Sequence, residues 1–431
     1  MNPEKFLNSL INYEKIPGYN YNLNNYRKFL QNFSSPQEKL RNVINIAGTK
    51  GKGSTAAIIS SCLRSCGYRV GLFTSPHLSR INERIKINNN EISNRDLARC
   101  LGQIKPYIKG KNRARTFFEV LTTVAFLHFI RKKTDFSILE TGLGGRLDTT
   151  SITNPILSVI TRIGYDHTDL LGNKLSQIAA EKAGIIKPDV KLITKHQRST
   201  AQRVISRAAR AKNASIVFAE DQHKIKILEL SKRGTHVNIC GDMGRFSAFL
   251  PLTGQHHLEN LLIALSVLSE LRKLGYTIST RAVRKGIRNI RLRGRFDIIS
   301  KNPLMIFDGA HNQDSFEALY RNLDRLKIRN FTIIFGSNRN KDIQYCLKYI
   351  FPRAKEVLLV QTDNPRARDP LEIYQQAKKY QNRLVISPSM QTAINYAKNR
   401  FKNNTAIVIT GSFYLWPLSE KYSGSRDGKD C

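Results

Sequence analysis

A glycine-rich turn that carries lysines, at residues 48–55, constrains this chain more than any other stretch. The apolar residues 43–46 before it predict a short buried strand, and Ser54 begins a pattern that predicts a helix. Glycines let the backbone turn sharply with its N–H groups pointing inward, and the helix dipole adds positive potential. Lys52 can reach the outer phosphates of a nucleotide. The order of these features favours a phosphate-binding loop over a plain glycine-rich turn.

The spacing departs from the general Walker form. Gly53 stands between Lys52 and Ser54, where that motif has lysine followed directly by serine or threonine.

Length and charge set the next limits. With 431 residues, of which 41% are hydrophobic, the chain can bury two or three cores, and we expect two domains. There are 70 Lys and Arg residues against 33 Asp and Glu, a formal charge of +37, which favours an anionic partner. Because the excess is spread along the whole chain without a basic tail or an aromatic RNA-binding string, we expect anionic small molecules and no nucleic acid.

The cysteines and the apolar runs indicate the compartment. The six cysteines form no CxxC pair and no zinc-type spacing, which is typical of reduced thiols. No apolar stretch approaches the roughly 20 residues that a membrane helix needs, and the N-terminus lacks the apolar region of a signal peptide. We therefore expect a soluble cytoplasmic protein without a membrane partner.

Two polar residues follow predicted strands of the first half. Residues 136–139 form a buried strand that ends at Glu140, and the strand 156–161 is followed by His167. Ligands bind at the carboxyl ends of parallel strands, and a carboxylate there can hold a cation that bridges phosphates. A helix cap or a salt bridge is the alternative for Glu140, and a satisfied core or surface residue is the alternative for His167.

A capping-box spacing marks the start of an apolar helix. Thr116 and Glu119 lie three residues apart at its head, and Phe117 and Phe118 stand between them. From the pattern alone, the two aromatic residues could be plain core residues.

The second half of the sequence predicts further strands alternating with helices, and a boundary between two domains. Residues 189–218 continue as strand, helix and strand, residues 224–249 predict a β-rich segment, and residues 252–265 predict a helix that carries Asn260. The basic segment 290–297 is the expected boundary. Strands predicted at 331–335, 357–360 and 406–410 then alternate with helices.

Several strings carry a resemblance to a known family. GTKGKGS, FTSPHL and ETGLGGRLD, with weaker strings up to Tyr414, resemble the folylpolyglutamate synthase and dihydrofolate synthase family of the Mur ligase superfamily. The resemblance implies an α/β fold with two domains. Residues 1–295 would form a doubly wound N-terminal domain with the phosphate loop, and residues 296–431 a smaller Rossmann-like C-terminal domain.

The family's chemistry implies an activity and its cofactors. The chain would add L-glutamate to a folate such as tetrahydrofolate, with dihydropteroate as a second candidate acceptor, through an acyl phosphate with release of ADP and phosphate. ATP would lie between the lobes, with Mg²⁺, in two ions, and a carbamylated lysine as cofactors. The protein would be a monomer.

The resemblance also assigns residues. The implied ATP contacts are Lys50, Gly51, Lys52, Gly53, Ser54, Asn260, Arg295, Asp308 and His311. The implied metal ligands are Ser75, Glu140, His167 and Lys182, with Lys52, His167 and Lys182 as catalytic residues and Lys182 carbamylated. The implied substrate contacts are Phe117, Phe118, Glu119, Leu147, Asp148 and Thr149. Ser151 stands where the family usually has asparagine.

Two other functions stay open. A Mur-type ligase of cell-wall nucleotides usually carries a separate domain before the phosphate loop, where this chain has only about 42 residues. A nucleotide-dependent nucleic-acid-binding module would use the basic charge and would bind DNA with a steep salt dependence.

Overall fold

The computed structural model describes residues 2–12, 22–108, 115–401 and 405–420. Most of a loop expected at 16–22, and the polar tail after Glu420, lie outside the described residues. The chain divides into two compact units. Unit 1 comprises Met1–Glu229, His236–Pro251 and His256–Arg291, and unit 2 comprises Leu230–Thr235, Leu252–Gln255 and Leu292–Cys431.

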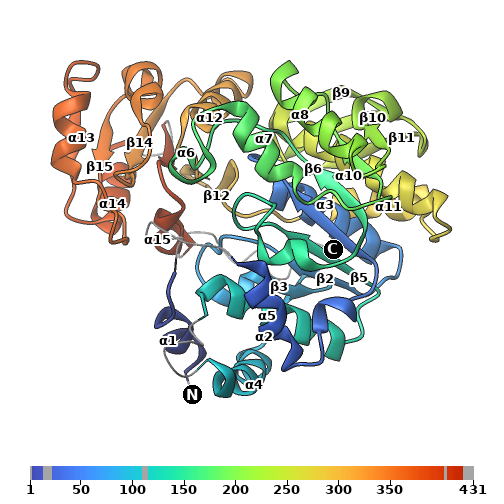
Figure 1. The fold of residues 1–431 in the computed structure, drawn as a ribbon. Helices are drawn as coiled ribbons and strands as arrows, with labels where there is room; N and C mark the ends of the chain where they lie inside the picture. Colours follow the sequence, from blue (N-terminus) through green and yellow to red (C-terminus); the bar gives the residue numbers. More distant parts are fainter. Residues whose placement is uncertain (1, 13–21, 109–114, 402–404, 421–431) are drawn as a thin grey trace. The chain divides into compact units, whose positions relative to one another are not determined.

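An eight-stranded sheet forms the centre of unit 1 (Figure 1). Its strand order is β4-β3-β2-β5-β1-β6-β7-β8. The strands are β1 (Val43–Ala47), β2 (Val70–Phe73), β3 (Ile85–Ile87), β4 (Asn90–Glu91), β5 (Phe136–Glu140), β6 (Pro155–Ile160), β7 (Leu192–Thr194) and β8 (Ile216–Phe218). At one edge, β3 pairs antiparallel with both β2 and β4.

Strand β1 lies in the interior of this sheet, between β5 and β6. All five of its residues are buried, and it pairs in parallel with β5 on one side and β6 on the other. Such near-continuous apolar strands occur where helices cover both faces of a sheet. The strands predicted around residues 43, 136 and 156 are confirmed, with ends that differ by one residue.

The helices of unit 1 pack against this sheet and against one another. They are α1 (Pro3–Asn8), α2 (Leu23–Gln31), α3 (Lys52–Ser65), α4 (Asn94–Ile104), α5 (Phe117–Arg131), α6 (Thr168–Leu171), α7 (Leu175–Ala183), α8 (Ser199–Arg210), α9 (Ala219–Gln222), α10 (Gln255–Lys273) and α11 (Thr280–Arg288). Helix α5 forms one core with α2, α4 and the sheet residues Val43, Phe73 and Leu139. Helices α7 and α8 cover β6 and β7 in a second core.

The segment predicted to be β-rich is a separate three-stranded sheet. Its order is β11-β10-β9, with β9 at His223–Ser231, β10 at Gly234–Gly241 and β11 at Gly244–Leu250.

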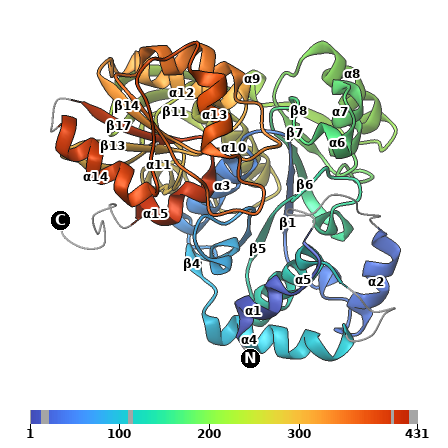
Figure 2. The ribbon, with the colours of Figure 1, turned by 90° about the vertical axis from the view of Figure 1, so that its left-hand side faces the viewer.

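Unit 2 contains a six-stranded sheet of order β12-β13-β17-β14-β15-β16. Strands β13, β17 and β14 run side by side in Figure 2. The strands are β12 (Asp297–Lys301), β13 (Leu304–Asp308), β14 (Phe331–Phe335), β15 (Val357–Leu359), β16 (Leu384–Ile386) and β17 (Ala406–Thr410). The helices are α12 (Gln313–Arg325), α13 (Pro370–Ala377), α14 (Met390–Phe401) and α15 (Trp416–Glu420).

The start of unit 2 differs from simple strand–helix alternation. β12 and β13 pair antiparallel, whereas β13, β17, β14, β15 and β16 pair in parallel. Residues 302 and 303 form the tight connection between β12 and β13, which is too short for a crossover helix. Among the described residues, no helix is long and apolar enough to cross a membrane.

Candidate nucleotide and ligase site

The phosphate loop follows β1 at the carboxyl edge of the unit 1 sheet. Helix α3 begins at Lys52, two residues earlier than the pattern predicts, and Gly51 precedes it with a φ of 89°. That left-handed conformation favours glycine. The Lys52 Nζ lies 3.1 Å from the carbonyl oxygen of Gly48 and donates to it, so the side chain curls back over the loop. The backbone and Lys52 thus face the same small space.

The loop after β6 is bonded to the phosphate loop. The backbone N–H groups of Thr49 and Lys50 both donate to the carbonyl of Arg162, at 2.9 and 3.1 Å. The Lys50 ammonium pairs with the Asp166 carboxylate at 3.1 Å. Asp166 is a site residue that we did not assign from the sequence, although its place beside His167 was visible there.

Asn260 closes the loop from α10. A Cβ atom on Gly51 would lie 2.1 Å from the Asn260 Oδ1, so the amide sits directly against the backbone of the loop. Asn260 is buried, and its Nδ2 has no hydrogen-bond partner among the described residues. A buried amide donor without a partner costs free energy, and a ligand oxygen at this place would satisfy it.

We expect Gly51→Ala to weaken nucleotide binding strongly. The added methyl group would clash with Asn260, and the φ of 89° disfavours alanine. Calorimetric titration with ATP measures the effect, and Gly67→Ala is the matched control. Gly67 also has a positive φ, of 96°, but a Cβ there would meet nothing within 4 Å. Equal losses in both variants would mean that strain alone, without the contact to Asn260, is responsible.

Glu140 and Ser75 meet beside the phosphate loop. The backbone N–H of Ser75 donates to the Glu140 Oε2 at 3.0 Å. A Cβ on Gly53 would lie 3.1 Å from the same oxygen. Glu140 is buried at the end of β5, so its carboxylate faces the loop at the edge where the sequence predicted it.

Lys182 is a buried lysine near the end of α7. The residue is 5% exposed, and burial, with Lys52 as the next cause, lowers the pKa of its ammonium to about 7. The glycine-rich loop after β5 packs against the backbone at the end of α7. A Cβ on Gly145 would lie 3.0 Å from the Lys182 carbonyl oxygen. A large fraction of this amine is therefore neutral near pH 7.

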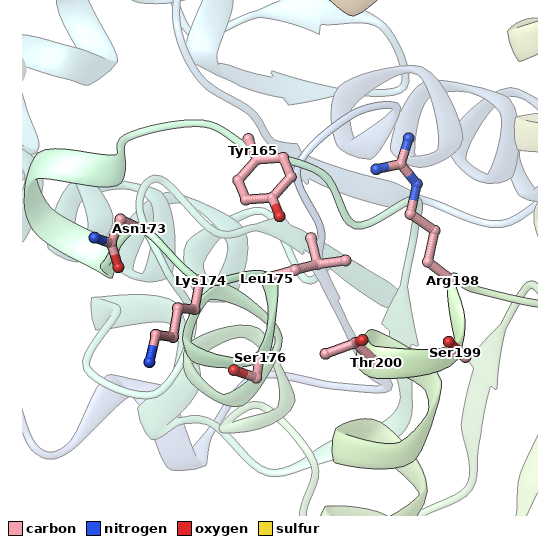
Figure 3. A pocket seen from close by; sticks show the side chains of 8 residues that line it. All are labelled: Tyr165, Asn173, Lys174, Leu175, Ser176, Arg198, Ser199 and Thr200. Carbon is pink, nitrogen blue, oxygen red and sulfur yellow. The ribbon is translucent and has the colours of Figure 1, made fainter.

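His167 stands at the start of α6 with a φ of 50°. Its Nε2 lies 4.0 Å from Asp166 Oδ1, and about half of its side chain is exposed. A pocket of about 690 Å³ opens close by (Figure 3). Its lining is Tyr165, Asn173, Lys174, Leu175, Ser176, Arg198, Ser199 and Thr200, which includes none of the site residues predicted from the sequence.

The three residues predicted as substrate contacts on α5 have different surroundings. Thr116 and Glu119 form the predicted capping box, with the Glu119 Oε2 accepting from the Thr116 N–H at 2.8 Å. Phe117 is buried. Phe118 is half-buried and packs on Gly142, where a Cβ would lie 2.5 Å from its ring.

Asp148 organises the loop after β5. Its two carboxylate oxygens accept four hydrogen bonds, from the N–H groups of Gly142, Leu143 and Thr150 and from the Thr150 hydroxyl. Burial raises the pKa of its carboxyl group. Beside it, Leu147 is half-buried, and the hydroxyls of Thr149 and Thr122 lie 2.8 Å apart. The loop is thus held rigidly against α5.

A second cluster lies in unit 2, at the end of β13. The Asp308 carboxylate accepts from the N–H groups of Phe296 and Ala310, each at 2.9 Å. Burial raises its pKa to about 6, against the lowering effect of Arg295. The Arg295 guanidinium lies over the Phe413 ring at 4.5 Å, and the His311 Nδ1 donates to the Gly309 carbonyl at 2.8 Å. Phe413, which we did not assign from the sequence, therefore belongs to this cluster.

Comparisons with known proteins agree with this architecture. Residues 46–268 match the Mur ligase middle domain, and residues 294–413 match the Mur ligase glutamate ligase domain. The dihydrofolate synthase/folylpolyglutamate synthase of Bacillus subtilis is 32% identical and aligns over 91% of this chain and 93% of its own.

Solved structures show the same fold. The folylpolyglutamate synthase of Thermotoga maritima is 30% identical, with a TM-score of 0.85 over 98% of this chain and 96% of its own. The chain of a folylpolyglutamate synthase (FPGS) complex with AMPPCP and folate is 25% identical, with a TM-score of 0.81 over 98% of this chain and all of its own. The chain therefore belongs to the folylpolyglutamate synthase/dihydrofolate synthase family of the Mur ligase superfamily.

Proposed function

We propose that this protein is an ATP-dependent ligase that adds L-glutamate to a folate, with dihydropteroate as a further candidate acceptor. The observation that carries the proposal is the phosphate loop itself, where the Lys52 ammonium bonds to the Gly48 carbonyl and the Glu140 carboxylate lies against Gly53. The buried Lys182, whose pKa the charge of Lys52 helps to lower, supports it. Family membership supports the same activity. We expect the enzyme to act as a monomer.

The reaction has two steps. The terminal carboxylate of the folate attacks the γ-phosphorus of ATP, ADP leaves, and an acyl phosphate forms. The amine of glutamate then attacks the activated carbonyl carbon, loses a proton and expels inorganic phosphate. Both steps build negative charge on phosphoryl oxygens, so fixed positive charge and N–H groups accelerate them.

The residues of the phosphate loop supply this charge in our proposal. The N–H groups of residues 50–54 and the Lys52 ammonium bind the phosphates, and Asn260 offers its buried Nδ2 to the nucleotide. The salt bridge of Lys50 with Asp166 holds the loop in place. Glu119 and Asp148 fix the start of α5 and the loop after β5. Phe118 and Leu147, which are half-buried, would contact the folate, whereas Phe117 and Thr149 are buried and would support these contacts from behind.

The donor set fits Mg²⁺. Carboxylate and hydroxyl oxygens are the ligands that this hard cation prefers. The Glu140 carboxylate lies next to Gly53 of the phosphate loop and accepts from the backbone N–H of Ser75, the residue that carries the hydroxyl. We propose that Ser75, Glu140, His167 and Lys182 hold Mg²⁺, in one or two ions. When bound, it neutralises charge on the transferred phosphoryl group.

Lys182 fits this set only after a chemical change, because an ammonium group would repel Mg²⁺. Its depressed pKa keeps much of the amine neutral, and a neutral amine adds to CO₂ with loss of one proton to give a carbamate. The product is an oxygen donor like a carboxylate. We therefore propose that Lys182 is carbamylated.

In unit 2, we propose that Asp308, Arg295 and His311 bind ATP. Each oxygen of the Asp308 carboxylate accepts a hydrogen bond from a backbone N–H, and each can accept another, for instance from a ribose hydroxyl.

We expect Asp308→Asn to weaken ATP binding about 10- to 150-fold, since a hydrogen bond to a charged group contributes about 1.5–3 kcal/mol. Folate binding should change little. Isothermal calorimetry with ATP and with folate measures both, and Asp324→Asn, on the surface of α12, is the matched control. Unchanged ATP affinity would remove Asp308 from the nucleotide site.

ADP release tests the function directly. Dihydropteroate and tetrahydrofolate are each supplied with ATP, with and without L-glutamate. Release that depends on both the acceptor and glutamate supports the ligase, and the acceptor that works defines its substrate. Release with neither acceptor, together with salt-sensitive binding to random DNA, would favour a nucleic-acid-binding module instead.

A further inference from the structure

Arg84 is an unusual residue because it is a charged side chain in the core. Arg84 is 2% exposed and has one of the largest fully buried side chains among the described residues. Burying a guanidinium is costly unless its hydrogen bonds and its charge are compensated. Its Nε donates to the His77 Nδ1 at 2.8 Å, and its Cζ lies 5.1 Å from the centre of the Phe117 ring.

The hydrogen bond from Arg84 to His77 fixes which nitrogen of the imidazole ring carries the proton. A guanidinium can only donate hydrogen bonds, so the His77 Nδ1 must accept with its lone pair. The imidazole is then neutral, and its proton resides on Nε2. Arg84 thereby selects one tautomer of His77, whose Nε2–H becomes a donor.

The position of these residues connects them to the proposed ligase site. His77 follows two residues after Ser75, whose N–H binds Glu140. Phe117 is the first residue of α5, next to Phe118. Arg84 therefore touches both the turn after β2 and the start of α5, which carry the proposed metal and folate contacts.

The turn around Arg84 is itself rigid. The carboxylate of Glu83 accepts from the backbone N–H groups of Leu78, Ser79 and Arg80, at 2.9, 2.7 and 2.6 Å. The Thr74 N–H donates to the Arg84 carbonyl at 2.9 Å. A turn that is hydrogen-bonded in this way can hold a side chain in one geometry.

We propose that Arg84 is a positioning residue for the folate: it holds His77 as the Nε2–H tautomer, which donates to a carboxylate oxygen of the folate, and it holds Phe117 at the head of α5. This proposal rests on the proposed ligase function. Arg84 itself need not touch a substrate.

Kinetics provide the first test. Arg84→Met keeps the length of the side chain but removes the donors, and we expect kcat/KM for folate to fall about 10- to 100-fold, as for other residues that orient a group in contact with a ligand. The Kd for ATP should stay within about twofold of wild type. Arg80→Met is the matched control, because Arg80 lies in the same turn with its side chain 72% exposed, and it should behave like wild type. Equal loss of ATP and folate binding in Arg84→Met would overturn the proposal.

Imidazole ¹⁵N NMR provides a test that needs no activity. The chain has nine histidines, and the His77 signals are assigned by their loss in His77→Gln. In the wild type, Nδ1 should have the shift of an unprotonated nitrogen and Nε2 that of a protonated one. Arg84→Met should give a mixture of tautomers. A protonated Nδ1 in the wild type would overturn the proposal, even if the ligase activity is confirmed, and the signal can be read even if that activity is absent.

A pair of His77 variants covers the case in which Arg84→Met does not fold. Asparagine can place an acceptor oxygen near the position of Nδ1 but lacks the Nε2 donor, whereas glutamine can place a donor near Nε2. We expect His77→Gln to keep more folate affinity than His77→Asn. The reverse order would overturn the proposed role of the Nε2–H.

Discussion

Replacing Lys52 by alanine should lower kcat by at least about a thousandfold, which corresponds to ~4 kcal/mol of lost transition-state stabilisation. The ammonium curls over the phosphate loop and donates to the Gly48 carbonyl, so it is placed to meet a phosphoryl group. The residue is only half-buried at the head of α3. The melting temperature should therefore stay close to that of the wild type.

Steady-state ADP release, with calorimetry for ATP affinity, measures the effect. Lys226→Ala is a suitable control because Lys226 is an exposed lysine on β9, and its loss should leave the rate unchanged. Near-wild-type activity in Lys52→Ala would refute the assignment of residues 48–55 as the phosphate loop.

Replacing Lys182 by alanine should leave the enzyme nearly inactive. If Lys182 carries the carbamate that binds Mg²⁺, alanine removes a metal ligand, and small added carboxylates should restore part of the rate. ¹³C-labelled bicarbonate supplied to the wild type should give a carbamate carbon signal. Because the amine must be neutral to react and its pKa is about 7, this signal should weaken as the pH falls below 7.

Lys187 supplies the matched control. It lies five residues further on, its pKa is also lowered by burial, and its ammonium donates to the Ser151 carbonyl. We expect Lys187→Ala to keep the carbamate signal and Lys182→Ala to lose it. Full activity of Lys182→Ala, or a metal-loaded active enzyme without the signal, would exclude Lys182 as a ligand.

Local sequence patterns predicted the elements that carry the site. Glu140 ends a strand of five buried residues, and the Thr116–Glu119 spacing forms the capping box that the pattern indicates. These features depend on residues close together in the chain. Strand ends and caps are therefore visible before any tertiary contact is known.

Contacts between distant residues could not be predicted in this way. Nothing near Asn260 indicates that its amide meets Gly51, and nothing near Asp166 indicates that it pairs with Lys50. Arg84 is the clearest case, because an arginine in a polar segment is normally exposed, and only the packing of the turn on α5 buries it. The assignments at these positions relied on the resemblance or were missed.

The bonds between the phosphate loop and Arg162 have a consequence for synthesis of the protein. Thr49 and Lys50 leave the ribosome early, but the carbonyl that orders their N–H groups is made more than a hundred residues later, and β1 also needs β5 and β6 as neighbours. A nascent chain that ends before β6 therefore lacks an ordered phosphate loop. Contacts of such sequence separation slow folding, so ATP can stabilise this unit only after most of its sheet has been translated.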